Sequence, residues 1–201
     1  KIANESGIET LPEFWSKELA QKILQKYGPA KIITAFNVFA HIDDIHSFIE
    51  GIKILLSVDG FFILESPHIY DLIDKTEFDT IYHEHLSYLA LKPIQRLVEE
   101  HGMKVARVEK HEIHGGSIRV YIEHKYQKRS DGSAERIFKQ EDESGLYSLR
   151  YYEQFKENVE LVKIGLSFII QKIKKEGKSI SIFGASAKGN VLLNYCGVNK
   201  N

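Results

Sequence analysis

Two histidines and a carboxylate gather in one short segment of the chain, Tyr82-His83-Glu84-His85. A histidine beside a carboxylate suits general-base chemistry near pH 7, because imidazole titrates close to that pH and a carboxylate stabilises the imidazolium. A metal site has less support, since a zinc-binding helix places two histidines four residues apart and no cysteine lies nearby. A solvated loop is the third interpretation, and the segment alone does not decide among them.

All nine histidines of the 201-residue chain lie between His41 and His124, so acid–base chemistry is expected in that region. His41 directly follows an apolar run, which favours either a ligand contact or a surface position. Asn37 lies inside the same run, where a buried amide needs hydrogen-bond partners. The segment 114–117 (HGGS) is typical of a hairpin turn, and Arg119 could face a bound anion or a surface acid.

Residues 184–190 (GASAKGN) contain the residue types that let backbone N–H groups and an ammonium group reach a phosphate. An ordinary strand–helix turn explains the segment equally well. Ser186 stands where the dinucleotide fingerprint G-x-G-x-x-G needs its middle glycine, and the Gly-Lys-Ser/Thr of a P-loop is absent. A nicotinamide-dependent enzyme is therefore disfavoured.

The elements around these segments alternate as in a parallel α/β sheet. Apolar runs at 31–40 and 61–65 predict strands buried on both faces, and an amphipathic helix at 45–56 separates them. Strand, helix and strand with short joints predict a βαβ unit. The segment 67–91 then leaves the carboxyl end of the second strand, where ligands bind in open α/β sheets.

A helix at 93–101 and two strands, at 104–109 and 117–124, follow this excursion. The joint between the two strands is short enough for an antiparallel hairpin. An amphipathic helix at 12–27 precedes the first strand.

The polar segment 125–145 is predicted as a linker between a domain at 1–124 and the beginning of another at 146–201. The second unit is expected to contain a long amphipathic helix (146–175), a buried strand (179–183) and a short helix (191–195).

Composition excludes several classes of protein. Lys and Arg number 27 against 28 Asp and Glu, so the net charge of −1 leaves no electrostatic footprint for nucleic acid or an anionic membrane. With 43% hydrophobic and 27% charged residues, the chain is typical of a globular protein. No apolar run suggests a membrane span or a signal peptide, so a cytoplasmic protein is expected. The single Cys196 excludes an internal disulfide framework and a multi-cysteine zinc site within this chain.

Four segments together resemble the S-adenosylmethionine-dependent sugar-nucleotide C-methyltransferases, in the order that family shows. They are 37–41 (NVFAH), 77–88 (EFDTIYHEHLSY), 114–121 (HGGSIRVY) and 184–190 (GASAKGN). The resemblance implies an α/β fold: the latter part of a class I (Rossmann-like) methyltransferase sheet that ends in an antiparallel hairpin, then a long helix and the start of a second α/β domain.

Members of that family also have an amino-terminal zinc-binding module and a glycine-rich S-adenosylmethionine loop. Neither pattern occurs in this sequence, so the resemblance implies a chain truncated at both ends, with zinc only in a missing module. Such a fragment is expected to be inactive alone. The exposed edge of its first strand could support a homodimer.

The resemblance assigns a role to each matching residue. His85 is the general base that removes a proton from the sugar carbon next to a keto group, and Tyr82, Glu84 and His41 orient it or stabilise the enolate. In an extended segment Tyr82 and Glu84 would point away from His85, so these roles require a turn.

The remaining roles concern the cofactor and a nucleotide-sugar substrate. Asn37 would lie beside S-adenosylmethionine. The substrate-binding assignments are His114, Ser117 and Arg119 for the sugar or its phosphates, and Ser186, Lys188 and Asn190 for the pyrophosphate. The alternative function is a noncatalytic nucleotide-sugar binding or assembly module with the same fold.

Overall fold

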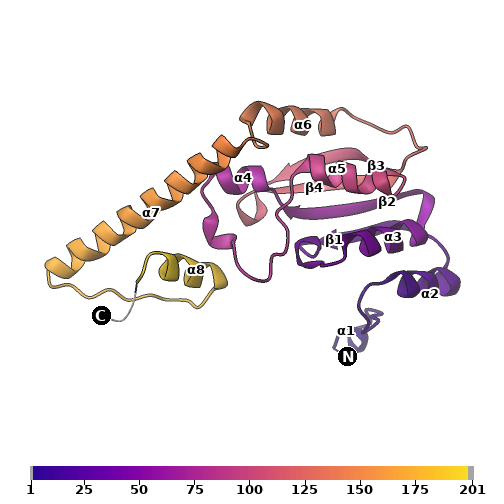
Figure 1. Cartoon of the computed structure of the whole chain (residues 1–201). Helices are drawn as coiled ribbons and strands as arrows, with labels where there is room; N and C mark the ends of the chain where they lie inside the picture. Colours follow the sequence, from indigo (N-terminus) through magenta and orange to yellow (C-terminus); the bar gives the residue numbers. More distant parts are fainter. Residues whose placement is uncertain (1, 199–201) are drawn as a thin grey trace.

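Four strands form one mixed sheet in the order β1-β2-β4-β3 (Figure 1). β1 (Ala30–Phe36) runs parallel to β2 (Leu56–Pro67), and β4 (Ser117–His124) pairs antiparallel with both β2 and β3 (Met103–His111). The predicted order, a parallel pair followed by an antiparallel hairpin, is confirmed. The structure is a computed structural model that describes residues 2–198.

Helices surround this sheet and extend beyond it. They are α1 (Ile2–Glu5), α2 (Lys17–Tyr27), α3 (Ile45–Leu55), α4 (Ile69–Asp74), α5 (Leu91–Glu100), α6 (Ser133–Ser144), α7 (Leu149–Lys175) and α8 (Ala187–Tyr195), with 3-10 turns η1 (Phe39–His41), η2 (Phe78–Thr80) and η3 (Ile113–Gly115). No helix in residues 2–198 is both long and apolar enough to cross a lipid bilayer.

One hydrophobic core joins the sheet to α3, α5 and α6. Alternate residues of the inner strands point into it, among them Phe62 on β2 and Ile122 on β4, both fully buried. α3 contributes Ile49 and Ile52 from the predicted apolar stripe. Its amino terminus is capped as the sequence suggests, because the Asp44 carboxylate accepts a hydrogen bond from the backbone N–H of Ser47.

β1 is shorter and more exposed than expected. It ends at Phe36, because Asn37 adopts the left-handed conformation with φ of 54° and its N–H bonds to the Glu65 carbonyl. The expected burial on both faces is wrong: β1 is an edge of the described sheet, and Ile32 is 64% exposed. Pairing of this edge with a second copy stays a prediction.

More than half of the segment predicted as a linker, 125–145, is the helix α6. Its Ala134 and Ile137 pack into the core, and its Glu141 is fully buried. The apolar residues of α6, which are Ala134, Ile137 and Phe138, pack against the core, and the composition of the charged segment does not show this. The domain boundaries stay a prediction.

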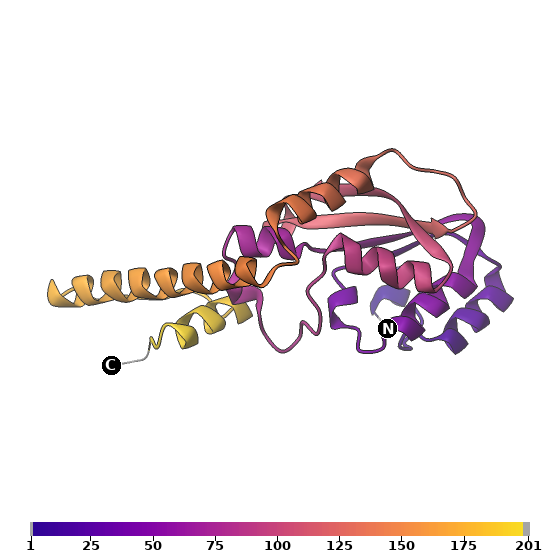
Figure 2. The same cartoon turned by 45° about the horizontal axis from the view of Figure 1, so that its top comes forward.

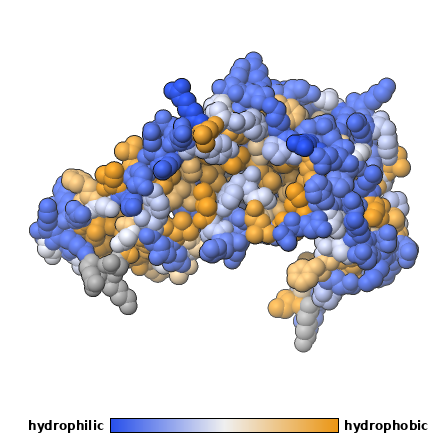
Figure 3. All heavy atoms as spheres, viewed as in Figure 1, coloured by the Kyte–Doolittle hydropathy of each residue, from blue (hydrophilic) through white to orange (hydrophobic). Residues whose placement is uncertain are grey.

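The carboxyl-terminal region forms an arm beside the sheet. The long helix α7 is confirmed, and α8 runs alongside it (Figure 2). The strand expected at 179–183 is wrong, since that segment has no regular structure and Phe183 is fully exposed. α8 begins four residues earlier than expected, because the Ser186 hydroxyl caps it by accepting from the Gly189 N–H. Apolar side chains gather over this arm (Figure 3).

Candidate active site

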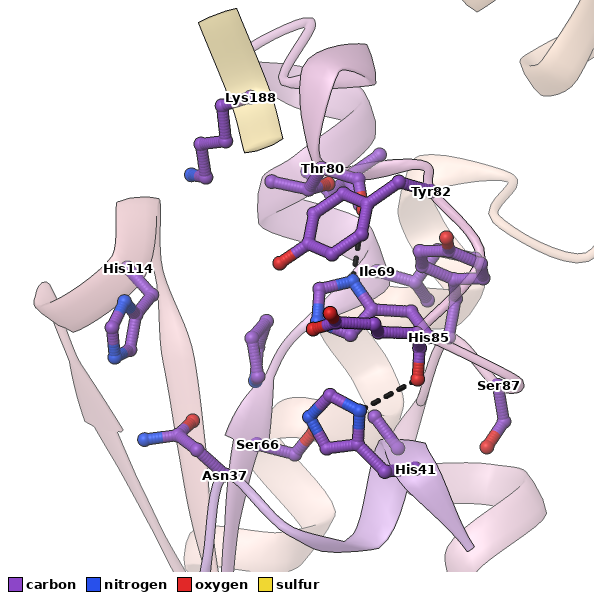
Figure 4. A pocket seen from close by; sticks show the side chains of 15 residues that line it. Asn37, His41, Ser66, Ile69, Thr80, Tyr82, His85, Ser87, His114 and Lys188 are labelled. Carbon is purple, nitrogen blue, oxygen red and sulfur yellow. Dashed lines mark hydrogen bonds between the residues drawn. The ribbon is translucent and has the colours of Figure 1, made fainter. Parts of the chain in front are cut away.

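A cavity of about 250 Å³ opens at the carboxyl ends of β1 and β2, where the sequence places a ligand site (Figure 4). Its walls come from five parts of the chain: the end of β1 with η1, the end of β2 with α4, the segment 80–88, the turn before β4, and the first turn of α8. Its polar lining residues are Asn37, His41, Ser66, Thr80, Tyr82, Glu84, His85, Ser87, Tyr88, His114 and Lys188.

The segment that carries the candidate base turns sharply, as its proposed roles require. The N–H of His85 donates to the Tyr82 carbonyl over 3.1 Å, which closes a turn. The next amide, that of Leu86, donates to the carbonyl of Ala40 over 2.8 Å and ties the turn to η1. The rings of Tyr82 and His85 consequently lie together, with centroids 4.5 Å apart.

His85 is oriented by a main-chain group. Its Nδ1 lies 2.8 Å from the carbonyl oxygen of Thr80, which can only accept a hydrogen bond. Nδ1 therefore carries the proton, and the lone pair of the neutral ring is on Nε2. A histidine held in this way can take a proton from a ligand at Nε2.

His41 is held by the same kind of contact. Its Nδ1 lies 2.6 Å from the main-chain carbonyl oxygen of Glu84, so the Nε2 of His41 is also the free acceptor. The two imidazole rings are 5.1 Å apart between centroids. The cavity thus holds two adjacent imidazoles with the same tautomer, and Glu84 serves His41 through its backbone while its side chain lines the wall.

Asn37, directly after the carboxyl end of β1, has two energetically unfavourable features. Its φ of 54° is unfavourable for a residue with a side chain, and its buried Oδ1 has no hydrogen-bond partner within the described residues. The hydroxyl oxygen of Ser87 lacks a partner in the same way. A bound molecule with N–H or O–H donors would satisfy both atoms.

His114 approaches the cavity from the turn before β4, in a left-handed conformation with φ of 54°. The turn is packed tightly against its neighbours. A Cβ at Gly115 would overlap the carboxylate of Glu77, and a Cβ at Gly116 would overlap the side chain of Asp71. Both glycines also have positive φ, 84° at Gly115 and 144° at Gly116, so a side chain at either position would be strained as well as crowded.

Four of the sequence-predicted site residues do not line the cavity. Arg119 is bound instead to the buried Glu65, with its Nε and Nη2 atoms 2.9 and 2.7 Å from one carboxylate oxygen. Ser117 is buried and donates to the Ile113 carbonyl. Ser186 caps α8, and Asn190 is exposed on it. Of the three residues assigned to a pyrophosphate, only Lys188 reaches the cavity.

Sequence reasoning missed Thr80, Ser87 and Tyr88. Thr80 acts through its carbonyl, a group every residue has, so no sequence signal marks it. Burial raises the pKa of Tyr88, whose ring stands edge-on to that of His85 at 6.1 Å, so the phenol is neutral. The run of aromatic residues around His85 was the available signal. The described residues contain no cluster of three or more side chains arranged to hold a metal ion.

An α/β sheet with a cavity at the carboxyl ends of its strands, lined by two oriented imidazoles, is an arrangement typical of enzymes that bind small molecules. Residues 112–201 match the family described as C-methyltransferase C-terminal domain. The chain is also 33% identical over 202 residues to the C-methyltransferase NovU of Streptomyces niveus, an alignment that covers 98% of this chain and 47% of NovU. These two similarities support a C-methyltransferase family for the chain, which spans about half the length of this relative.

Proposed function

We propose that this chain carries the acid–base centre of a C-methyltransferase that acts on a keto-deoxysugar nucleotide. In this reaction the Nε2 atom of His85 removes a proton from the carbon next to the keto group, and the resulting enolate carbon takes the methyl group. The hydrogen bond from His85 Nδ1 to the Thr80 carbonyl carries the proposal, because it leaves Nε2 as the basic atom.

Several groups can stabilise the enolate once the proton has left. The Tyr82 hydroxyl, the His114 ring and the Lys188 ammonium are directed toward the same space as His85 (Figure 4). Donors preorganised around a developing oxyanion stabilise a transition state more than a ground state. Lys188 lies in the first turn of α8, so a negatively charged part of the substrate would extend toward that helix.

S-Adenosylmethionine, when bound, would supply the electrophilic methyl group, and its sulfonium sulfur would become a neutral thioether as the S–CH3 bond breaks. The residues present fit this molecule at one point, since the unpartnered Oδ1 of Asn37 needs a donor and the ribose hydroxyls and ammonium group of the cofactor are donors. Asn37 would therefore orient the cofactor beside the two imidazoles.

Proton removal can be tested apart from methyl transfer. The assay follows deuterium uptake from D₂O at the carbon next to the keto group of a keto-deoxysugar nucleotide, by NMR and without a methyl donor. The variant His85→Gln is expected to slow the exchange by about 10²–10⁴-fold. The matched control is His83→Gln, because His83 is exposed in the same turn and does not line the cavity.

The outcomes separate the proposal from its alternative. Exchange that depends on His85 and not on His83 supports the base assignment. Nucleotide-sugar binding without any exchange in the unaltered protein would instead indicate the noncatalytic binding module. Exchange that is unchanged in His85→Gln would refute the assignment of His85.

A further inference from the structure

A buried histidine outside the cavity joins two carboxylates. His68 follows β2 directly and is fully buried. Its Nδ1 lies 3.2 Å from an oxygen of Asp71, and its Nε2 lies 2.8 Å from an oxygen of Glu141. Burial alone would lower the pKa of His68, but the hydrogen bonds and charges of the two carboxylates outweigh it and raise that pKa. Each ring nitrogen faces an oxygen of a carboxylate, which can only accept when ionised, so the geometry favours an imidazolium that donates from both nitrogens.

Glu141, which contacts His68, also binds the amino terminus of α5. The same carboxylate accepts from the backbone N–H of Leu91 over 2.6 Å and of Lys92 over 3.3 Å, and the hydroxyl of Tyr147 also donates to it. α5 begins after Ala90, whose side chain cannot cap a helix, so Glu141 supplies the missing cap from α6.

Asp71, the other carboxylate that contacts His68, also contacts β3 and the turn before β4. Its second oxygen accepts from the ammonium of Lys110 on β3 over 3.0 Å. Its side chain also packs against Gly116, so closely that a Cβ there would overlap it. The N–H of His68 donates to the Gly116 carbonyl over 2.9 Å. His68 thus contacts the turn that carries His114 both directly and through Asp71.

His68 is also continuous with the cavity wall, since Pro67 and Ile69 on either side of it both line the cavity. We propose that His68 is a positioning residue: by holding Asp71 and Glu141 together it fixes the turn 113–116 and so places His114 in the cavity. The inference rests on the proposed function, because it assigns a role in the same site.

The placement of His114 can be measured without substrate. In long-range nitrogen–proton NMR spectra, a ring with two N–H groups is distinguished from a neutral ring, so the spectra of the unaltered chain report the charge of His68. In the variant His68→Gln both N–H donors are on one amide nitrogen and do not reproduce the two separate donors of the ring, so the variant is expected to shift the ring signals of His114. The exposed His83→Gln serves as the control and is expected to leave them unchanged.

A second variant keeps the test valid if His68→Gln does not fold. Removing the histidine leaves two buried carboxylates with less positive charge, which is destabilising. The double variant His68→Gln/Glu141→Gln removes the surplus charge. We expect the double variant to be more stable than His68→Gln. We expect its His114 signals to stay displaced, because two glutamines do not replace the charged hydrogen bond from His68 to Asp71.

Two results would overturn the proposal. One is a neutral His68 ring at neutral pH, or His114 signals that are unchanged in both variants. The other is a double variant in which stability and the His114 signals recover together, since His68 would then be purely structural. A deuterium-exchange assay in which the unaltered protein is inactive would instead refute the proposed function and leave the placement of His114 intact.

For an active enzyme, kinetics give a further readout. Displacement of His114 is expected to lower kcat/KM for the keto-deoxysugar nucleotide by about tenfold in the double variant. The loss is expected in kcat, because the His114 ring is assigned to stabilise the enolate and such a donor acts mainly on the transition state. A double variant with unchanged kcat would contradict the positioning role.

Discussion

The carboxylate of Glu141 connects α6 to the rest of the fold, so its removal is expected to be costly. Glu141→Ala leaves the His68 ring with one carboxylate. It also removes the hydrogen-bond acceptor of the Leu91 and Lys92 N–H groups and of the Tyr147 hydroxyl. Breaking a buried pair by removing one partner typically costs about 3–5 kcal/mol. We expect a loss of that size in the free energy of unfolding.

Urea denaturation with a matched control measures this loss. Glu143 lies on the same helix, and its carboxylate is 68% exposed and 3.6 Å from the Lys139 ammonium. Such surface pairs contribute about 0–1 kcal/mol, so Glu143→Ala is expected to have little effect. The comparison uses the midpoint at a constant denaturant slope. A loss for Glu141→Ala no larger than for the control would refute the reasoning.

The same network predicts how stability depends on pH. Burial alone would raise the pKa values of Glu141 and Asp71. The contact with His68 outweighs burial and lowers the pKa of Glu141, and the contacts with His68 and Lys110 lower the pKa of Asp71 in the same way. Their stabilisation is present above the unfolded values of 4.5 and 3.8 and is lost as pH falls through the lowered folded values. The contribution of His68 is complete below 6.5 and is lost as pH rises through its raised folded pKa. In Glu141→Ala both slopes are expected to flatten.

Two substitutions in the cavity are expected to separate stability from binding. Asn37→Gly relieves the positive φ and removes the unpartnered oxygen, so we expect about 0.5–1 kcal/mol more stability in thermal unfolding and weaker S-adenosylmethionine binding by calorimetry. Equal binding would contradict the cofactor role. Lys188→Gln is expected to weaken binding of a nucleoside diphosphate and to reduce its salt dependence, whereas Lys178→Gln, an exposed lysine paired with Glu176, changes neither. An unaltered salt dependence in Lys188→Gln would remove that lysine from the anion site.

Local patterns in the sequence determined most of the elements. The period of the apolar residues placed α3 and α7, and the alternation from 117 to 124 matched β4 residue for residue. The order of these elements predicted the parallel pair and the hairpin. These features depend on neighbours within a few residues, because burial of one helical stripe or one strand face is written in the local spacing.

Only the tertiary structure decided how the chemistry is arranged. The tautomer of His85 depends on a main-chain carbonyl, the partner of Arg119 lies 54 residues away on β2, and the buried pair of His68 and Glu141 joins residues 73 apart. The expected strand at 179–183 failed for a related reason: a strand is stable only beside another strand, and none of the described residues pairs with that segment. Spacing along the chain shows which residues can do chemistry, whereas hydrogen bonds between distant segments decide which of their atoms face the cavity.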